Sequence, residues 1–492
     1  MSLFIGIDLG TSACKLLLMD EGGKILNIVS KEYPVEFPRP GWSQQDPEDW
    51  WLAVREGVPE LLSGFDAAQV AGIGCGGQMH GLVVLDGDDA VIRPAILWND
   101  GRTEAQVRYL NEEVGTNKLL AWTGNIAFAG FTAPKILWMR DEEPELFARI
   151  AHIMLPKDYL AYKLTGVNAT DASDAAGMLL LDVDGRRWSP HMLELCGISE
   201  SQLPRVFESW EAVGRVRDEL ADELGLPHGV VVAAGAGDNA AAAVGTGVVG
   251  AGSCNISLGT SGTVFIPTSS FAAGLGDKIH SFCHADGGWH LMGCILSAAS
   301  CNKWWVEDIL GAADFAAEQA GIDADAVTPD LPYYLPYLMG ERTPHNDTAA
   351  RGAFVGMNMA TTRSDMTRAV LEGVAFAIRD SVEIARGLGV ELRKSMICGG
   401  GSKSRLWMEM LANVCNLTLE MPETEQGPGY GGAILAAVAA GAFPSVGAAC
   451  EQLVHVRGTV EPKPELVSAY EARYQVWRGL YPALKSSFKQ MQ

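Results

Sequence analysis

The sequence lacks the features that mark membrane, secreted and zinc-binding proteins. No apolar run reaches the roughly 18 residues that a helix needs to cross a bilayer. The N-terminus meets an acid at Asp8 and carries no basic segment before it, so it does not resemble a signal peptide. None of the 10 cysteines forms a C-x-x-C pair, which removes support for zinc and redox motifs. Scattered cysteines in a chain this long indicate reduced, buried thiols, and we expect a cytoplasmic protein.

Basic residues are also scarce. The chain holds 37 Lys and Arg against 60 Asp and Glu, a net charge of −23. Such a surface repels nucleic acid and anionic lipid, so we expect neither nucleic acid nor a membrane as a partner. Hydrophobic residues make up 48% of the chain and the mean hydropathy is +0.09, which excludes disorder. A length of 492 residues, at roughly 150 per domain, predicts about three domains or two large ones.

Two common nucleotide-binding motifs are absent. No G-x-x-x-x-G-K-[ST] occurs, which excludes a P-loop. A predicted strand at Val230–Ala234 leads into Gly235-x-Gly237-x-x-Ala240, which fits the loose dinucleotide pattern. That pattern also needs an acid about 20 residues further on to hold the ribose. No Asp or Glu occurs between Asp238 and Asp277, so the dinucleotide interpretation fails.

The chain does contain an internal repeat. IDLGTSACK at 7–15 recurs as ISLGTSGTV at 256–264, about half a chain later. Apolar runs flank both copies and predict hairpins of similar construction, with strands at Phe4–Asp8, Cys14–Met19, Asn255–Leu258 and Thr263–Ile266. The uncharged stretch Ala240–Gly252 is the expected boundary. We therefore predict two related domains, residues 1–247 and 248–492.

Helices alternate with these strands. Asp46 followed by Pro47 predicts the start of one helix, and Ser364 is the expected N-cap of a long amphipathic helix that stops at Gly387. An apolar strand at Ser395–Cys398 runs into a glycine cluster, and another helix starts near Ser404. Strands that alternate with helices predict an α/β protein.

Three small Gly-rich turns follow predicted strands. They are Gly10-Thr11-Ser12, Gly259-Thr260-Ser261-Gly262 and Gly399-Gly400-Gly401-Ser402. Backbone N–H groups in such turns form concavities that bind anions, and the hydroxyls add donors. A single turn of this kind is weak evidence, but three in one chain, two of them repeats, favour a phosphate-binding site.

Acidic and histidine residues lie beside these turns. Asp8 ends the first strand and could hold Mg²⁺, or could cap the turn. Asp238 could be a helix N-cap, or the base that accepts a proton from an alcohol. Met79 and His80 lie in Gly77–Gly81, a setting suited to a polar small molecule. His280 and His284 would make a metal pair only on a helix, and the residues between them predict a strand.

Together these motifs resemble the FGGY family of carbohydrate kinases, from about residue 4 to about residue 445. The segment 130–142, with Gly130, Thr132, Lys135 and Asp141, fits one long family signature, and 352–372 fits a second. Further segments are similar to the members that phosphorylate D-xylulose: GQMHG at 77–81, ILWNDGR at 96–102, LPKDYL at 155–160, DASDAAG at 171–177, HSFCH at 280–284 and GERTPHN at 340–346. Glycerol kinases carry an Arg-containing segment in place of GQMHG, which argues against glycerol.

The resemblance implies two actin-like ATPase (ribonuclease H-like) domains around a cleft for ATP and sugar. It also implies a role for each matching residue. Asp238 would be the catalytic base, and Asp8 the acid near Mg²⁺ and the phosphates. The residues implied to bind sugar are Met79, His80, Asp238 and Asn239. Those implied to bind ATP are Thr11 and Ser12 in the first phosphate loop, Thr260 and Ser261 in the second, and Gly400, Gly401, Ser404 and Trp304 around the adenosine.

The expected activity is therefore ATP-dependent phosphorylation of D-xylulose at O5, by a cytoplasmic enzyme that could form a homodimer. Two alternatives stay open. One is a kinase for another ketose or polyol, such as ribulose, fuculose or gluconate, because a few side chains can switch sugar specificity. The other is a chaperone-like ATPase of the same fold that uses nucleotide to switch a binding surface.

Overall fold

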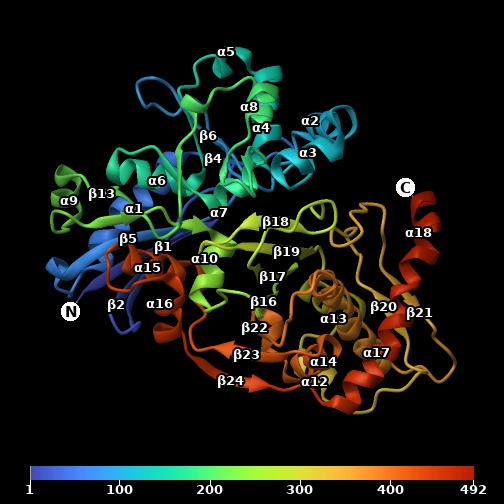
Figure 1. The fold of residues 1–492 in the computed structure, drawn as a ribbon. Coiled ribbons are helices and arrows are strands. Elements are labelled where there is room, and N and C mark those ends of the chain that lie inside the picture. Colours follow the sequence, from blue (N-terminus) through green and yellow to red (C-terminus); the bar gives the residue numbers. More distant parts are fainter. Residues whose placement is uncertain (1, 492) are drawn as a thin grey trace.

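Each half of the chain builds one mixed β-sheet, and the computed structural model, which describes residues 2–491, sets the two sheets side by side (Figure 1). The first sheet has the strand order β13-β14-β5-β1-β2-β3, with β15 paired to β5. Its strands are β1 (Leu3–Leu9), β2 (Ala13–Asp20), β3 (Ile25–Glu32), β5 (Val70–Gly77), β13 (Ala212–Arg215), β14 (Val231–Ala233) and β15 (Ala236–Gly237).

The second sheet has the order β18-β19-β17-β16-β22-β23-β24. Its strands are β16 (Ser253–Leu258), β17 (Gly262–Thr268), β18 (His280–Cys283), β19 (Trp289–Ile295), β22 (Lys394–Cys398), β23 (Thr418–Pro422) and β24 (Val456–Val460). Two-stranded ribbons complete the β structure: β4 (Gln44–Gln45) with β7 (Ala95–Ile96), β6 (Val83–Leu85) with β8 (His152–Met154), β9 (Ala169–Asp171) with β12 (Arg205–Phe207), β10 (Leu181–Asp182) with β11 (Arg187–Trp188), and β20 (Tyr333–Leu335) with β21 (Ala353–Val355).

The sequence repeat corresponds to a repeat of strand topology. β1 pairs antiparallel with β2 and parallel with β5, and β16 pairs in the same way with β17 and β22. The predicted hairpins are therefore confirmed, with boundaries that differ by one or two residues. His280 lies on strand β18, as predicted, which excludes a helical metal pair with His284.

Helices cover both sheets. In the first half they are α1 (Pro47–Leu61), α2 (Glu104–Arg108), α3 (Thr116–Thr123), α4 (Thr132–Glu142), α5 (Pro144–Phe147), α6 (Pro156–Thr165), α7 (Ala172–Ala175), α8 (Pro190–Cys196), α9 (Asp218–Leu224) and α10 (Asp238–Gly245). In the second half they are α11 (Ala299–Lys303), α12 (Phe315–Gln319), α13 (Arg363–Gly387), α14 (Arg405–Cys415), α15 (Gly427–Ala439), α16 (Val446–Leu453), α17 (Pro464–Arg478) and α18 (Leu480–Gln490).

The predicted N-cap at Asp46 and the helix start expected near Ser404 are confirmed. Asp46 caps α1 by accepting from the backbone N–H of Glu48, and Ser404 caps α14 by accepting from Trp407. The predicted N-cap of α13, Ser364, is wrong. Thr362 is the N-cap, since its side chain accepts from Asp365 while the Asp365 carboxylate accepts from Thr362. The predicted stop at Gly387 is correct.

Helix α15 packs on the first sheet although it belongs to the second half of the chain. In Figure 1, α15 lies beside the strands β1, β2 and β5 of the first half, and α16 lies next to α15. Glycines make this contact possible, because a Cβ on Gly6 of β1 would collide with the carbonyl of Gly429, and one on Gly74 of β5 with that of Gly432. The predicted boundary at 247/248 separates the strands of the two sheets. Helices α15 and α16 follow this boundary in the sequence, but they pack with the first half.

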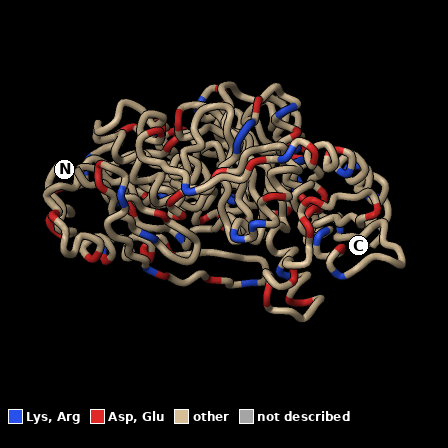
Figure 2. The backbone as a smooth tube through the Cα atoms, turned by 90° about the horizontal axis from the view of Figure 1, so that it is seen from below, with Lys and Arg blue, Asp and Glu red and all other residues tan. Residues whose placement is uncertain are grey.

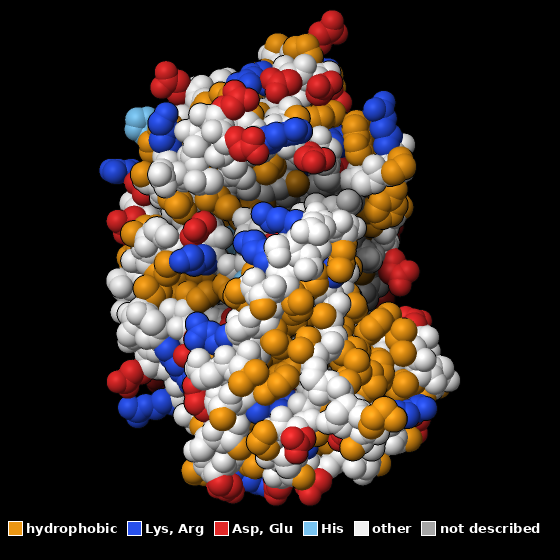
Figure 3. Space-filling model, turned by 90° about the vertical axis from the view of Figure 1, so that its right-hand side faces the viewer, with side chains coloured by type: hydrophobic (Ala, Val, Ile, Leu, Met, Phe, Trp, Pro, Cys, Tyr) orange, Lys and Arg blue, Asp and Glu red, His pale blue; other side chains and the backbone are white. Residues whose placement is uncertain are grey.

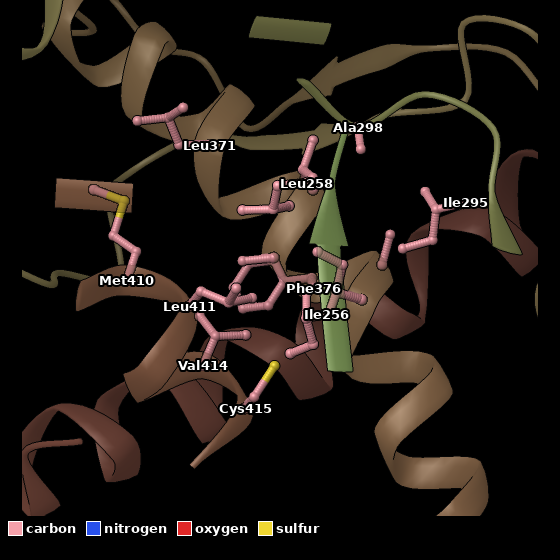
Figure 4. Close-up of a cluster of buried hydrophobic side chains, with 14 of the residues drawn as sticks. Ile256, Leu258, Ile295, Ala298, Leu371, Phe376, Met410, Leu411, Val414 and Cys415 are labelled. Atoms are coloured by element: carbon pink, nitrogen blue, oxygen red, sulfur yellow. The ribbon is translucent and has the colours of Figure 1, made fainter. Parts of the chain in front are cut away.

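Each half has its own hydrophobic core. In the second half, Figure 4 shows Ile256 and Leu258 of β16 packed near Phe376 of α13 and Leu411 of α14. A second cluster lies within the first half, a third joins the first half to Phe282, Cys283 and Met292 of β18 and β19, and a fourth joins α10 and α15 to the first sheet. These cores hold each sheet against its helices, so the turns at the strand ends are the parts of the fold that remain available to bind a ligand.

The surface is mixed. Figure 2 shows Lys and Arg dispersed among the more numerous Asp and Glu of both halves. On the face that Figure 3 shows, hydrophobic side chains gather in patches between charged residues. The cysteines are free thiols, most of them buried, as the sequence predicted. Within residues 2–491 we find no helix long and apolar enough to cross a membrane.

Candidate functional site

Asp8 and Asp238 both lie at the carboxyl ends of strands in the first sheet that neighbour β5. β1 and β15 flank β5 in parallel, and Asp8 and Ala236 both pair with Gly76 of β5. The chain then turns from β15 directly into α10, whose first residue is Asp238 and whose N-cap is Gly237. Since the carboxyl ends of parallel strands meet at one edge, the fold brings these two acids together.

The environment of Asp238 raises its pKa to about 7. Burial is the main cause, and the charge of Asp8 adds to it, while a hydrogen bond from the backbone N–H of Asn239 (2.7 Å) opposes the shift. Burial also raises the pKa of Asp8, and Lys15 opposes that shift. A carboxylate with a pKa near 7 is well matched to proton transfer at neutral pH.

His80 and Met79 lie next to this edge, after the end of β5. His80 adopts a left-handed backbone conformation, with φ of 68°. Its carbonyl accepts hydrogen bonds from Thr132 Oγ1 (3.0 Å) and Lys135 Nζ (2.8 Å), and its Nδ1 contacts the carbonyl oxygen of Gly177 at 2.8 Å. Burial, with the charge of Lys135, lowers the pKa of His80 to about 3. The ring is therefore neutral at pH 7.

This hydrogen bond fixes the tautomer of His80. A carbonyl oxygen only accepts, so Nδ1 carries the proton and Nε2 is an acceptor. Asn239 Nδ2 contacts Sδ of Met79, the residue before His80, at 3.8 Å and Asp238 Oδ1 at 3.1 Å. The structure thus brings together the four residues that the resemblance assigned to the sugar, with acceptors and an amide that suit hydroxyl groups.

The first Gly-Thr-Ser turn, between β1 and β2, is held by its own half. The carbonyl of Gly10 accepts from Tyr33 Oη (2.5 Å), and that of Thr11 accepts from Gln45 Nε2 (2.7 Å). Thr11 Oγ1 accepts from Trp98 Nε1 (3.0 Å), while Ser12 is exposed. The turn is rigidly anchored and still presents a hydroxyl to solvent, as a phosphate loop requires.

The second and third turns meet in the second half. The carbonyl of Thr260 accepts from the backbone N–H groups of Ala298 (3.0 Å) and Ser300 (3.3 Å), and Ser261 is exposed. Gly399 has φ of 88°, and a Cβ there would lie 2.6 Å from the carbonyl of Leu258. Only glycine allows this approach of the third turn to the second.

These two turns open onto a cavity of about 710 Å³. Its size and largely apolar lining suit a nucleotide, since ligand pockets are typically 300–1,000 Å³. It brings together Thr260, Gly400, Gly401 and Ser404, four of the residues that the resemblance assigned to ATP. Trp304 is not among its lining residues, although its neighbour Lys303 is. The ring of Trp304 stacks on Tyr334 instead, with centroids 6.4 Å apart.

Sequence reasoning did not assign several residues of the site. Phe315 and Gln319 of α12 line the cavity, and their sequence carries no motif that could have indicated it. Lys157 and Asp171 lie buried beside the strand that leads to Asp238. They belong to the LPKDYL and DASDAAG segments, which supported the resemblance but received no role.

Two sheets of repeated topology, with two acids at the strand ends of the first and a nucleotide-sized cavity beside the second, fit a two-domain ATPase of the actin-like fold. The match to known protein families identifies the class more narrowly. The model of the FGGY family of carbohydrate kinases, N-terminal domain, matches residues 3–245, and that of the C-terminal domain matches residues 254–440. The chain belongs to the FGGY family of carbohydrate kinases.

Relatives match over nearly the whole chain. A xylulose kinase of Escherichia coli (strain K12) is 40% identical, over 98% of this chain and 99% of its own length. The crystal structure described as a xyloylose kinase from Brucella ovis is 42% identical, with a TM-score of 0.93 over 98% of this chain and 99% of that one. A gluconate kinase from Lactobacillus acidophilus has the same TM-score at 25% identity, over 100% of both chains.

Proposed function

We propose that the protein transfers the γ-phosphoryl group of ATP to O5 of D-xylulose and forms D-xylulose 5-phosphate. The observation that carries the proposal is the position of Asp238, a carboxylate with a pKa of about 7 that contacts Asn239, whose amide also contacts Met79, the residue before His80. The similarity to xylulose kinases over 98% of the chain supports the choice of sugar.

In the proposed reaction, Asp238 accepts the proton of the O5 hydroxyl as that oxygen attacks the γ-phosphorus. The neutral His80 accepts a hydrogen bond from another sugar hydroxyl at Nε2, and Asn239 donates one. Little covalent chemistry is required of the protein, because phosphoryl transfer depends mainly on alignment and on stabilisation of charge.

The two Gly-Thr-Ser turns hold the phosphates from opposite sides. Thr11 and Ser12 belong to the first half, and Thr260 and Ser261 to the second. The adenosine occupies the cavity beside Gly400, Gly401 and Ser404. Since each half contributes one turn, closure of the halves would align the phosphates and exclude water that would otherwise accept the phosphoryl group.

Asp8 is the residue that would hold Mg²⁺. Within residues 2–491 no group of three or more His, Cys, Asp or Glu side chains could hold a metal ion by itself. A single carboxylate fits Mg²⁺ in this setting, because the ion usually takes one or two carboxylates and completes its shell with phosphate oxygens and water. When bound, the ion would neutralise charge on the phosphates.

One alternative sugar has a specific observation in its favour. The gluconate kinase from Lactobacillus acidophilus shares the fold at a TM-score of 0.93, so the architecture accommodates more than one substrate. Ribulose and fuculose belong to the same alternative. A location in the cytoplasm and a homodimer remain predictions, and sedimentation of the purified chain would measure its mass in solution.

A coupled assay of ADP release tests the proposal. We expect D-xylulose to give the highest kcat/KM in a panel that includes ribulose, fuculose, gluconate and glycerol. Asp238→Ala should lower kcat by about 10³-fold or more, with an unchanged circular dichroism spectrum. Asp88→Ala, at an exposed acid, is the matched control. Near-normal turnover of Asp238→Ala would reject the base, and another preferred sugar would reject D-xylulose alone.

A further inference from the structure

A group of charged side chains is buried behind the strand that leads to Asp238. Lys157 Nζ lies 2.6 Å from Asp158 Oδ1, 2.9 Å from Asp171 Oδ1 and 3.9 Å from Asp174 Oδ2, and none of these side chains is more than 1% exposed. Lys157 Nζ also donates to the carbonyl of Ala234 at 3.3 Å. The neighbouring carboxylates raise the pKa of Lys157, so the ammonium stays charged.

Buried ion groups rarely increase stability over an apolar core, because desolvation of the charges offsets their attraction. One lysine facing three carboxyls is unfavourable unless one acid is protonated. Asp174 fits that state, since burial raises its pKa well above the usual range and both of its oxygens lack a hydrogen-bond partner. Such a costly arrangement points to a role beyond stability.

The contacts of Asp171 lead from this group to the base. Its Oδ2 accepts from Ser173 Oγ (2.5 Å), from the backbone N–H of Ser173 (2.8 Å) and from Ser209 Oγ (2.7 Å). Ser173 Oγ has donated its proton to Asp171, so it meets the backbone N–H of Gly237 as an acceptor, at 3.3 Å. Gly237 is the residue before Asp238 and the N-cap of α10. Lys157 therefore holds the chain at Ala234 directly and at Gly237 through Asp171 and Ser173.

The same segment reaches the other side of the sugar site. Asp171 and Ser173 begin the turn of helix α7, and Gly177, four residues after Ser173, binds the ring of His80. One buried segment thus contacts both the backbone beside the base and the histidine that faces the sugar.

We propose that Lys157, Asp171 and Ser173 are positioning residues for phosphoryl transfer, which hold the backbone of Asp238 and the ring of His80 in one rigid unit. This inference rests on the proposed function of Asp238. Its physical basis is that the transferred proton requires a hydrogen bond of about 2.6–3.2 Å, and a displacement of about 1 Å can lower the rate by about 10²-fold.

Isosteric variants of the full-length protein test the proposal. Ser173→Ala removes the acceptor of the Gly237 N–H, and Asp171→Asn replaces the carboxylate that joins Lys157 to Ser173. Asp174→Asn is the matched control, because an amide resembles the protonated acid in shape and charge. The measurements are kcat, the KM for sugar, the KM for ATP and the melting temperature of each variant.

We expect Ser173→Ala to lower kcat by about tenfold and Asp171→Asn by about 10²-fold. Asp171→Asn should also raise the KM for sugar, while the KM for ATP stays within twofold in both variants. Asp174→Asn should keep the wild-type kcat within about twofold. A merely structural role would instead lower the melting temperature and leave kcat per folded molecule unchanged, and that result would overturn the proposal. If Asp171→Asn does not fold, the kcat of Ser173→Ala tests the proposal by itself.

Asp238→Asn, measured beside these variants, separates the two proposals. If it retains wild-type turnover, the assignment of the base fails. If it is inactive while Ser173→Ala has wild-type kcat, only the positioning role fails. The assay uses whichever sugar the wild type turns over fastest, so a different substrate leaves the comparison valid.

Discussion

Nδ1 of His80 donates a hydrogen bond of 2.8 Å to the carbonyl oxygen of Gly177, a residue 97 positions further along the chain. The bond determines which ring nitrogen is free, and burial keeps the ring neutral by lowering its pKa to about 3. A residue without a side chain is needed at position 177, because a Cβ there would lie 2.5 Å from both Nδ1 and Cε1 of the ring.

Gly177→Ala should therefore displace the His80 ring. We expect the KM for sugar to rise about tenfold or more and the KM for ATP to stay unchanged, since the nucleotide cavity lies in the other half. Steady-state kinetics with each substrate varied in turn measures both constants. Gly87→Ala is the control, because a Cβ at Gly87 has no atom within 4 Å. An unchanged sugar KM in Gly177→Ala would show that the ring does not contact the sugar.

Gly399→Ala should affect ATP binding and leave sugar binding unchanged, which is the reverse of Gly177→Ala. Its Cβ would lie 2.6 Å from the carbonyl of Leu258, which pushes the third turn away from the second, and its φ of 88° strains any other residue. We expect the KM for ATP to rise about tenfold while the KM for sugar stays constant. Isothermal titration with ATP or its non-hydrolysable analogue gives an independent measure.

Gly389→Ala separates strain from collision. Gly389 has a similar φ of 81°, but a Cβ there meets no atom within 4 Å. This variant carries the same backbone penalty and should lower only the melting temperature. Equal effects of the two variants on ATP binding would contradict a specific role for the approach of Gly399 to Leu258.

The repeat and the short strands were predictable from the sequence because each depends on local patterns. The LGTS turns and their flanking apolar residues predicted both hairpins, and Asp46 with Pro47 predicted the start of α1. The N-cap of α13 was misplaced by two residues, since Thr362 and Ser364 both carry hydroxyls. Only the reciprocal bond between Thr362 and Asp365 distinguishes them.

Contacts between distant segments were less predictable. The packing of α15 on β1 and β5 depends on glycines at Gly6, Gly74 and Gly432, and a single sequence does not indicate which glycines face one another. The buried group around Lys157 was missed for a similar reason, because its three acids come from three different elements. Charged side chains in a sequence also normally indicate a solvent-exposed surface. Most of the predicted site residues lie at the end of a strand or directly after it, where the order of the strands in the sheet brings them together, whereas Trp304 and Ser404 do not.

The pH dependence of turnover should report the pKa of Asp238. Burial raises that pKa to about 7, so below pH 7 the carboxyl is protonated and cannot accept the proton of a sugar hydroxyl. We expect kcat/KM for sugar to fall about tenfold per pH unit below pH 7 and to reach a plateau above it. His80, with a pKa of about 3, should not contribute between pH 5 and 9. An acid limb centred near pH 4 would contradict the raised pKa.

The same pKa shift predicts that the base reduces the stability of the protein. The pKa of Asp238 is higher in the folded state, at about 7, than its ordinary value of 3.8, so the folded state binds more protons between these values. The free energy of unfolding therefore decreases as pH rises from 3.8 to 7, and the loss is complete above pH 7.

Asp238→Asn removes the ionisation and keeps the shape of the side chain. We expect its apparent melting temperature at pH 8 to exceed that of the wild type by about 2–5 °C, with the difference much smaller at pH 5. Scanning calorimetry at both pH values measures it, and Asp88→Asn, at an exposed acid, should show no such difference. A variant that is inactive and yet more stable at pH 8 would indicate that this carboxylate is kept for chemistry and not for folding.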